Sequence, residues 1–492
     1  MVKDVEDSML SAQISGKEQQ IREIVTMKST SHLKRNVERL ENVKSLFGCA
    51  LHMHQPIIPS KKDSGFISNL QYMFDNPNEG DNHNAEKFSI CYKRMNIIIK
   101  ELINEGCDPR IMLDYSGNLL WGLMKMGRND IINELLELTQ NQQKKNNTEW
   151  LGSFWSHAVA PSTPIRDLKL QISAWQHQFL SIFGEEALSR VKGFSLPEMS
   201  LPNHPDSLYV LVKEIRKAGY RWILVQEHTI ENLDGSVLSE KQKYIPNLLV
   251  AKNCTGKKEC IEVLIKTQGS DTKLVGQMQP YYQALEIDKQ LVGGKTIPSM
   301  VTQIADGENG GVMMNEFPKA YIQANQRCSS SQIKSESTLA ANGTEYLEFL
   351  ESKGLKIVDY PMVQALNQFK IWEIVGRDVN KHTVNDAIKI LMKKDQGFDM
   401  VGSSWTNNLS WEEGYQNVIE PINILSNKFH DKYDNLVNRN PKTTESSDYK
   451  EALLHLLLLE TSCFRYWGQG KWTKYAEDIY IQGCNLIDNR YE

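Results

Sequence analysis

The chain has 492 residues, of which 40% are hydrophobic and 24% charged, the balance of a globular protein with one large domain and a smaller one. Its formal net charge is −5 and its basic clusters are only pairs such as Lys144-Lys145, which argues against a nucleic-acid partner. The longest apolar run, Ala452 to Leu459, is far shorter than the roughly 20 residues that a membrane span needs, so no membrane partner is expected.

The first 44 residues are charged, and the stretch 19–40 is compatible with a helix. Residues 1–44 are therefore predicted to form an N-terminal helical arm, and the first 20 lack the apolar centre of a secretory signal. Eight cysteines are scattered along the chain without a CxxC pair, which is typical of free thiols in a reducing compartment. A cytoplasmic location is expected.

From residue 46 onward, short apolar segments that end in polar residues alternate with longer amphipathic segments. Strands that alternate with helices predict a parallel sheet, and residues 45–360 are expected to form a (β/α) barrel. Catalytic groups of such barrels lie at the carboxyl ends of the strands. The polar residues at the predicted strand ends are His52–His54, Asp114, Ser156-His157, Glu198, Gln226–His228 and Asp306.

Two segments depart from this alternation. A turn-rich stretch at about residues 245–297 is predicted to be an insertion that lies over the barrel mouth. After residue 361 the chain becomes helical, and its last segment, from Trp472 to Ile487, carries one apolar stripe at helical spacing. Residues 361–492 are expected to form a C-terminal helical domain that packs on the barrel.

The first candidate motif is His52-Met53-His54-Gln55-Pro56. Residues two apart on a strand face the same way, so both imidazoles are expected to point into one pocket. They suit either metal binding, as HxH does in barrel hydrolases, or hydrogen bonds to sugar hydroxyls. A pair of structural histidines is the plainer alternative.

Two carboxylates form the second candidate. Glu198 follows a short apolar strand and has Leu, Pro and Met neighbours, which limits its solvation and suits a nucleophile. Asp306 and Glu308 lie in the stretch 305–311, where four small residues surround the two carboxylates. A surface glutamate and a plain acidic turn are the alternatives. A retaining glycosidase needs two carboxyl groups roughly 5–5.5 Å apart, and strand ends of one barrel can bring these two together.

Aromatic residues near the strand ends and in the C-terminal part could stack on sugar faces, although large aromatics also dominate protein cores. The stacking candidates taken forward are Trp155, Trp405 and Trp467.

In their order along the chain, these motifs resemble the five signature regions of glycoside hydrolase family 57. Its members are α-glucan-active amylases, branching enzymes, glucanotransferases and amylopullulanases. The resemblance covers residues 46 to about 480. The matching segments are His52–Pro56, Trp155–His157 with Pro161, the segment around Glu198, Asp306–Glu308, and Glu460–Trp467.

The resemblance implies an incomplete seven-stranded (β/α) barrel followed by a C-terminal helical bundle. It implies a retaining mechanism without metal or organic cofactor, with Glu198 as nucleophile and Asp306 as proton donor. His52, His54, His157 and His228 would bind the sugar, with Gln55 beside them. The Glu227-His228 pair departs from the Asp-based motif of the family, and residues 268–282 do not match its well-studied amylases.

The sequence thus favours a retaining glycoside hydrolase or glucanotransferase that acts on oligo- or polysaccharide α-glucans. One alternative is a metal-dependent hydrolase of the amidohydrolase type that uses His52 and His54 as ligands, but it gives Glu198 no role and lacks a candidate for the bridging lysine. The other is a non-catalytic sugar-binding protein. Linkage, acceptor and oligomeric state stay open.

Overall fold

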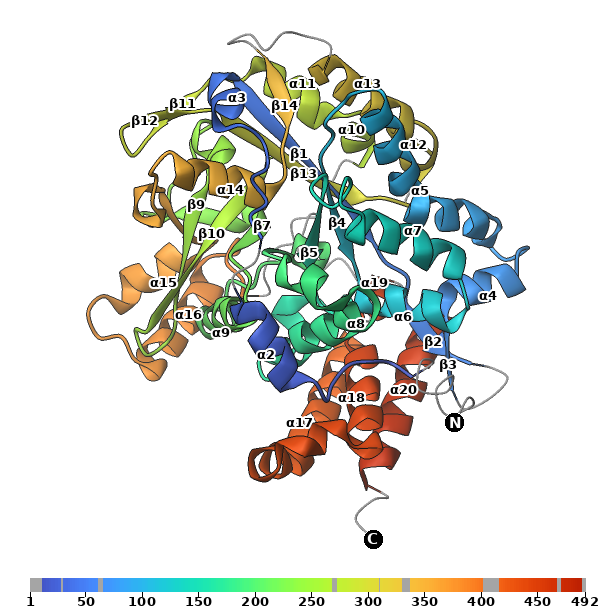
Figure 1. The fold of residues 1–492 in the computed structure, drawn as a ribbon. Coiled ribbons are helices and arrows are strands. Elements are labelled where there is room, and N and C mark those ends of the chain that lie inside the picture. The colour runs from blue at the N-terminus through green and yellow to red at the C-terminus, as the bar shows by residue number, and fades with distance from the viewer. Residues whose placement is uncertain are drawn as a thin grey trace.

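The computed structural model describes residues 11–27, 30–60, 65–267, 272–308, 310–329, 337–400, 416–466 and 470–488. Within them, seven strands lie side by side in the order β13-β1-β4-β5-β6-β7-β10 (Figure 1). Every neighbouring pair is parallel, and Lys266 of β10 pairs with Thr302 of β13 to close the ring. The strands are β1 (Ser45–Met53), β4 (Ile111–Tyr115), β5 (Thr148–Gly152), β6 (Gly193–Ser195), β7 (Trp222–Gln226), β10 (Lys258–Lys266) and β13 (Ser299–Asp306).

The predicted barrel is confirmed, with one strand fewer than the usual eight. All residues of β1, β4, β5 and β7 are buried, because side chains fill the barrel and helices cover its outside. This double burial explains why these segments read as continuous apolar runs. The covering helices include α5 (Ala85–Asn104), α6 (Gly117–Lys125), α7 (Asn129–Gln140), α8 (Leu168–Ser189), α9 (Pro205–Lys217), α13 (Phe317–Ser329) and α14 (Gly343–Ser352).

The segment 245–297 differs from the predicted insertion. Its β10 is a strand of the barrel itself, and β9 (Asn247–Lys252) returns antiparallel to it. The rest of the segment includes α10 (Thr272–Gly276), α11 (Gln279–Glu286) and the hairpin β11 (Gln290–Val292)–β12 (Lys295–Ile297). Ser45, the first residue of β1, donates a hydrogen bond to the Ala284 carbonyl. Helix α11 therefore packs at the amino end of the barrel, opposite the mouth over which the insertion was expected.

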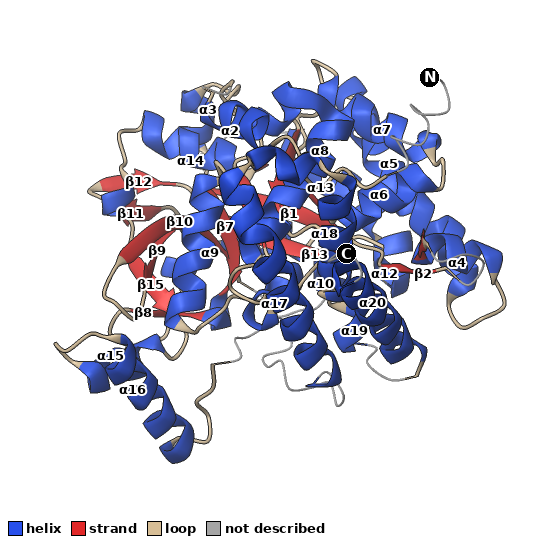
Figure 2. Ribbon diagram, turned by 90° about the horizontal axis from the view of Figure 1, so that it is seen from below, coloured by secondary structure: helices blue, strands red, loops and turns tan. Residues whose placement is uncertain are grey.

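The sheet also continues past the predicted boundary at residue 360. Strand β15 (Met362–Ala365) pairs with β9, and β8 (Ile230–Asn232) pairs with β15. Helices α15 (Gln368–Val375) and α16 (Lys381–Lys394) follow as a hairpin with a small core of their own, around Ile371 and Val384. Figure 2 shows this hairpin projecting from the side of the barrel, apart from the C-terminal helices.

The helical bundle lies further along the chain. It consists of α17 (Gln416–Arg439), α18 (Ser447–Leu459) and α20 (Lys471–Asp488), which pack on one another beneath the barrel (Figure 1). The apolar stripe predicted from Trp472 to Ile487 is buried in α20. None of the helices in the described ranges is both long and apolar enough to cross a lipid bilayer.

Shorter elements complete the connections. They are β2 (Ile57–Pro59), β3 (Phe66–Ser68), α4 (Asn69–Asp75), α12 (Gly310–Asn315), β14 (Thr338–Ala340) and α19 (Cys463–Tyr466).

The N-terminal arm is an integral part of the fold. Helix α2 (Glu18–Thr26) packs on α8, where the Lys17 amide donates to Nε2 of His177 at 3.0 Å. The Ser15 hydroxyl donates to the carbonyl of Thr444, beside the bundle, at 2.7 Å. After α3 (Val37–Asn42) the chain enters β1. The arm thus joins the barrel to the bundle.

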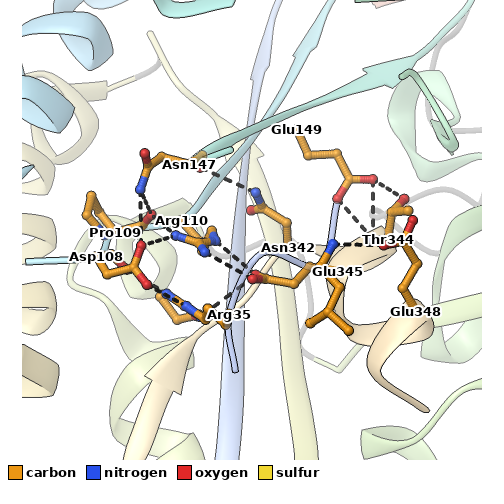
Figure 3. Close-up of polar contacts among 12 residues, drawn as sticks. Arg35, Asp108, Pro109, Arg110, Asn147, Glu149, Asn342, Thr344, Glu345 and Glu348 are labelled. Carbon is orange, nitrogen blue, oxygen red and sulfur yellow. Dashed lines mark hydrogen bonds and ion pairs between the residues drawn. The ribbon is translucent and has the colours of Figure 1, made fainter. Parts of the chain in front are cut away.

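A buried ion network fixes the arm at the amino end of the barrel (Figure 3). Nε of Arg35 donates to Asp108 at 2.6 Å, and Arg110 makes two hydrogen bonds to Glu345, at 2.9 and 3.0 Å. Arg110 also contacts Asp108, so two guanidinium groups are balanced by two carboxylates. Because charges buried in this way are stable only while paired, the loss of one member is costly.

We expect Arg35→Ala to lower the free energy of unfolding by about 3 kcal/mol, because Arg110 is then left between two carboxylates and the buried Glu345 loses one of its two cationic neighbours. Urea denaturation measures the change. Arg22→Ala is the matched control, since Arg22 is an exposed residue of the same arm, and its loss should change stability by less than about 0.5 kcal/mol. Equal effects of the two substitutions would show that the network does not hold the arm.

Candidate active site

The candidate site lies at the carboxyl end of the barrel, where parallel strands end together. Strand β1 runs between β13 and β4, and its register places His52 opposite both Asp306 and Asp114. His157 follows β5, and Glu198 follows β6. Residues far apart in sequence therefore meet on one rim, as the sequence predicted for this fold.

Three of the predicted histidines form a compact group. The rings of His54 and His157 stack with centroids 4.1 Å apart, and those of His52 and His157 lie 4.6 Å apart. Nε2 of both His52 and His157 is buried and has no hydrogen-bond partner among the described residues. Buried polar atoms are nearly always paired in proteins, so these two nitrogens are available for hydrogen bonds to a bound molecule.

The charge of this group is concentrated on His52. Burial alone would lower the pKa of His52, but the carboxylate of Asp114, which contacts its Nδ1 at 2.9 Å, and the other nearby acids together raise the pKa to about 9. Asp306 and Glu308 act in the same direction. Burial and the charge of neighbouring histidines lower the pKa of His54 and of His157 well below the ordinary value. At neutral pH one cationic and two neutral imidazoles therefore face the site.

Hydrogen bonds from two parts of the chain orient the neutral rings. Nδ1 of His54 lies 2.8 Å from Ser116 Oγ, and its Nε2 lies 3.3 Å from Cys463 Sγ. Nδ1 of His157 lies 2.6 Å from Ser462 Oγ. Ser462 and Cys463 follow α18, so the C-terminal bundle completes a site whose other residues come from the barrel.

Glu198 lies in η3 (Pro197–Met199) with a backbone φ of 58°, in the left-handed region that side chains other than glycine rarely adopt. His157 and Met199 share this region, with φ of 64° and 51°. Such strained residues concentrate at functional sites. Glu198 is 7% exposed, and its Oε1 lies 3.8 Å from Nδ1 of His157.

Asp306 is the last residue of β13 and is more exposed than the strand that precedes it. In the ring of strands, β13 and β6 are separated by β1, β4 and β5 on one side and by β7 and β10 on the other. Asp306 and Glu198 therefore lie on opposite sides of the barrel mouth. The three histidines lie between the two acids. His52 pairs with Asp306 in the strand register, and His157 lies beside Glu198.

The family model for Glycosyl hydrolase family 57 matches residues 48–269. The resemblance to glycoside hydrolase family 57 is confirmed. The matched range contains His52, His54, His157, Glu198 and His228, whereas Asp306 lies beyond it.

Solved structures of family 57 type share the fold. The 4-alpha-glucanotransferase of Thermococcus litoralis has a TM-score of 0.56 at 14% identity, over 92% of this chain and 60% of that one. For a GH57 branching enzyme of Thermococcus kodakaraensis the TM-score is 0.53 at 14% identity, over 90% of this chain and 89% of that one. For the alpha-amylase AmyC of Thermotoga maritima the TM-score is 0.51 at 11% identity, over 91% of this chain and 93% of that one. No curated protein sequence matches the chain significantly.

The other predicted sugar-binding residues differ in whether their side chains are accessible to a ligand. His228 lies in η4 (Glu227–Thr229) after β7, and Nδ1 of its ring contacts the Gln226 amide at 3.0 Å. The amide oxygen of Gln55 accepts a hydrogen bond from Asn69, so Gln55 is already engaged within the protein. Trp155 has no exposed surface and packs on Gly117, which leaves its ring no face for a sugar. Trp405 and Trp467 lie outside the described residues.

Sequence reasoning did not identify the hydrogen-bond partners of the histidines. The position of Asp114 at the end of a predicted strand placed it on the rim of the barrel. Its pairing with His52 could not be predicted, because it depends on β4 lying next to β1. Ser462 and Cys463 lie inside the fifth resembling segment. Ser116 carried no signal of its own, because it is the ordinary N-cap residue of α6.

The site geometry does not favour the metal-dependent alternative. The described residues contain no group of three or more His, Cys, Asp or Glu side chains placed to hold a metal ion. Glu198 also has a position in the site that the amidohydrolase alternative does not explain.

The Asp114–His52 pair predicts a pH-dependent stability. The pKa of His52 is about 9 in the folded protein and 6.5 as the reference, so its stabilisation is complete below pH 6.5 and is lost as the pH rises through 9. We expect Asp114→Asn to cost about 3 kcal/mol near pH 6 and much less at pH 9.5, by urea denaturation.

Asp130→Asn serves as the control for this measurement. Asp130 forms a partly exposed pair with Arg128, and its pKa is lowered by that arginine, so the cost of its loss should be small and equal at the two pH values. A cost of Asp114→Asn that does not fall with pH would contradict the assignment of a charged His52.

Proposed function

We propose that the protein is a retaining glycoside hydrolase or glucanotransferase that acts on α-glucans through a glycosyl-enzyme intermediate. The observation that carries the proposal is the placement of Glu198 and Asp306 on opposite sides of one barrel mouth, with the histidine group between them. A sugar ring bound by those histidines has a carboxylate on each side. Two carboxyl groups that flank the scissile bond are what glycoside hydrolysis requires.

Glu198 is the proposed nucleophile. Its carboxylate oxygen attacks the anomeric carbon, and the glycosidic bond breaks with its electron pair passing to the leaving oxygen. The left-handed backbone of residues 198 and 199 holds this carboxylate in a single place. Its low exposure limits the hydration that an attacking oxygen must lose.

Asp306 is the proposed acid and base. It gives its proton to the leaving oxygen in the first step, and in the second it takes a proton from water or from a sugar hydroxyl, which then attacks the anomeric carbon and releases Glu198. Its partial exposure at the strand end suits exchange of protons with an incoming acceptor. Water as acceptor gives hydrolysis, and a second glucan gives transfer.

The histidine group is the proposed sugar site. The free Nε2 atoms of His52 and His157 are placed to hydrogen-bond sugar hydroxyls, and the cationic His52 makes the stronger contact. We extend the site to His228 on the same rim and, from the sequence pattern alone, to Trp405 and Trp467 as stacking residues. For Gln55 and Trp155 we propose an indirect part, in which they support the ends of β1 and β5.

A cytoplasmic location is part of the proposal. All eight cysteines are unpaired, and five of them are buried, as expected for a chain that folds in a reducing compartment. No organic cofactor or metal has a part in the proposed chemistry.

The first test replaces the two carboxylates. Glu198→Gln should lower kcat on an α-glucan by at least about 10³-fold while leaving the melting temperature near that of the wild type, because only the attacking oxygen is lost. Asp306→Asn should also be severely impaired, and azide should partly restore turnover of an activated substrate in an Asp306→Ala variant. Glu286→Gln, at an exposed position, is the control and should keep full activity.

The second test identifies the reaction. We expect turnover of amylose, pullulan or maltooligosaccharides with retention of anomeric configuration, followed by proton NMR, because two displacements restore the starting configuration. Shorter products with new reducing ends indicate hydrolysis, and longer products without them indicate transfer. Inversion would overturn the mechanism, and binding without turnover would favour the non-catalytic alternative.

A further inference from the structure

The three imidazoles of the site differ in the use of their Nε2 atoms. In His52 and His157 only Nδ1 is engaged, and Nε2 has no hydrogen-bond partner among the described residues. Both residues are buried, at 6% and 3% exposure. In His54, by contrast, both ring nitrogens are engaged. Two rings therefore offer a nitrogen to a bound sugar, whereas the third is already hydrogen-bonded on both sides within the protein.

The groups that engage His54 come from different parts of the chain. Oγ of Ser116 lies 2.8 Å from Nδ1, and Sγ of Cys463 lies 3.3 Å from Nε2. Ser116 belongs to the barrel, where it is the N-cap of α6, and Cys463 begins α19 after the bundle helix α18. The thiol therefore faces the nitrogen that is free in the other two rings.

The backbone holds the thiol in this place. Thr461 forms an antiparallel bridge with Ala158, and the Ser462 amide donates to the His157 carbonyl at 3.2 Å. Thr461 and Ser462 are both buried. The segment that carries Cys463 is thus bound to the residues that follow β5, and the thiol has a fixed position at the barrel mouth.

Both groups of this contact are uncharged at neutral pH. Burial and the charge of Glu198 raise the pKa of the Cys463 thiol well above its ordinary value, so the thiol keeps its proton. Burial and the charge of His52 lower the pKa of His54, and the Asn118 side chain opposes them without outweighing them. A neutral imidazole has one N–H and one lone pair, so the contact is a hydrogen bond between a thiol and an imidazole.

The two possible tautomers of His54 differ in their fit to these partners. With the ring proton on Nδ1, the ring donates to the Ser116 oxygen, and its Nε2 lone pair accepts the S–H of Cys463. With the proton on Nε2, the ring N–H would point at sulfur, which is a weak acceptor, and the thiol proton would have to turn away from the ring. The surroundings therefore favour a proton on Nδ1.

We propose that Cys463 is a positioning residue of the sugar site: its S–H donates to Nε2 of His54, fixes the ring proton on Nδ1 and withholds this ring from hydrogen bonding to the substrate. The inference rests on the proposed sugar-binding role of the histidine group. The His54 ring stacks on His157 with centroids 4.1 Å apart, so a fixed His54 keeps the free Nε2 of His157 in one direction. The substrate then forms hydrogen bonds with His52 and His157 and none with His54.

The first test reads the tautomer of His54 by 15N NMR of protein labelled at its histidines, without substrate. In the wild type we expect Nδ1 to be protonated and Nε2 to be unprotonated, and the spectrum of His54→Gln identifies the signals. Cys463→Ala should mix the two tautomers and bring the two 15N shifts closer together, whereas Cys463→Ser, which keeps a donor, should preserve the separation. A wild-type ring protonated on Nε2, or unchanged shifts in C463A, would overturn the inference.

The second test separates binding from catalysis with maltooligosaccharides. C463A should raise KM by about fivefold, the scale of one lost hydrogen bond, and should change kcat by less than about twofold, because the carboxylates stay in place. C463S should return KM to near the wild-type value. An unchanged KM in C463A, or a C463S variant as impaired as C463A, would contradict a positioning role for the thiol.

Cys484→Ala is the matched control. Cys484 is another half-buried free thiol of the C-terminal bundle, in α20. Its loss should leave both KM and the 15N shifts of His54 at their wild-type values. Changes of the same size as in C463A would show that the bundle as a whole, and not the contact between Cys463 and His54, is responsible, and would remove the inference.

The two proposals fail in different ways. Full activity of Glu198→Gln and Asp306→Asn would remove the proposed function and leave the tautomer of His54 as it is. Inactive carboxylate variants, together with a KM and a tautomer that do not respond to Cys463→Ala, would leave the proposed function in place and remove the part of Cys463.

Discussion

The parallel register of β1 between β13 and β4 is the constraint on which the site depends. One strand places His52 opposite Asp306 on one side and opposite Asp114 on the other. The Asp114 carboxylate then keeps His52 charged despite its burial, and that charge helps to keep His54 and His157 neutral. A shift of the β1 register by one residue would turn His52 to the other face of the strand, away from Asp114. The charge distribution of the site therefore depends on the pairing of β1.

The bundle is bound to this arrangement by a second buried network. His430 of α17 contacts Asp167 at 2.5 Å, and Gln171 of α8 donates to Glu460 at 2.6 Å. The same glutamine accepts from the amide of Ser156, which precedes His157. The chain that leaves Glu460 then delivers Ser462 to the His157 ring. Helix packing at a distance thereby sets the orientation of a ring at the barrel mouth.

The sequence predicted the strands and strand-end residues that depend on local pattern. It did not predict the contacts that depend on the order of the strands in the barrel. Apolar runs that end in polar residues predicted β1, β4, β6 and the positions of Glu198 and Asp306 on one rim. The strand-like residues 261–265 of β10 were assigned to an insertion instead of the barrel, because the antiparallel β9 before β10 and the turn-rich residues after it broke the alternation. Trp155 shows the limit for single residues: ring chemistry alone does not tell whether the ring faces a ligand or, as here, the Cα of Gly117. The partners of His52, His54 and His157 come from two other segments, residues 114–116 and 462–463, and no spacing in the sequence relates them.

The hydrogen bond between Ser15 and Thr444 joins residues 429 positions apart. During synthesis the amino-terminal arm therefore emerges long before the segment that receives it. The barrel strands can pair in the meantime, but the histidines gain Ser462 and Cys463 only after residue 463 has left the ribosome. A chain that ends before these residues would therefore lack the hydrogen bonds that orient the rings of His54 and His157 at the barrel mouth.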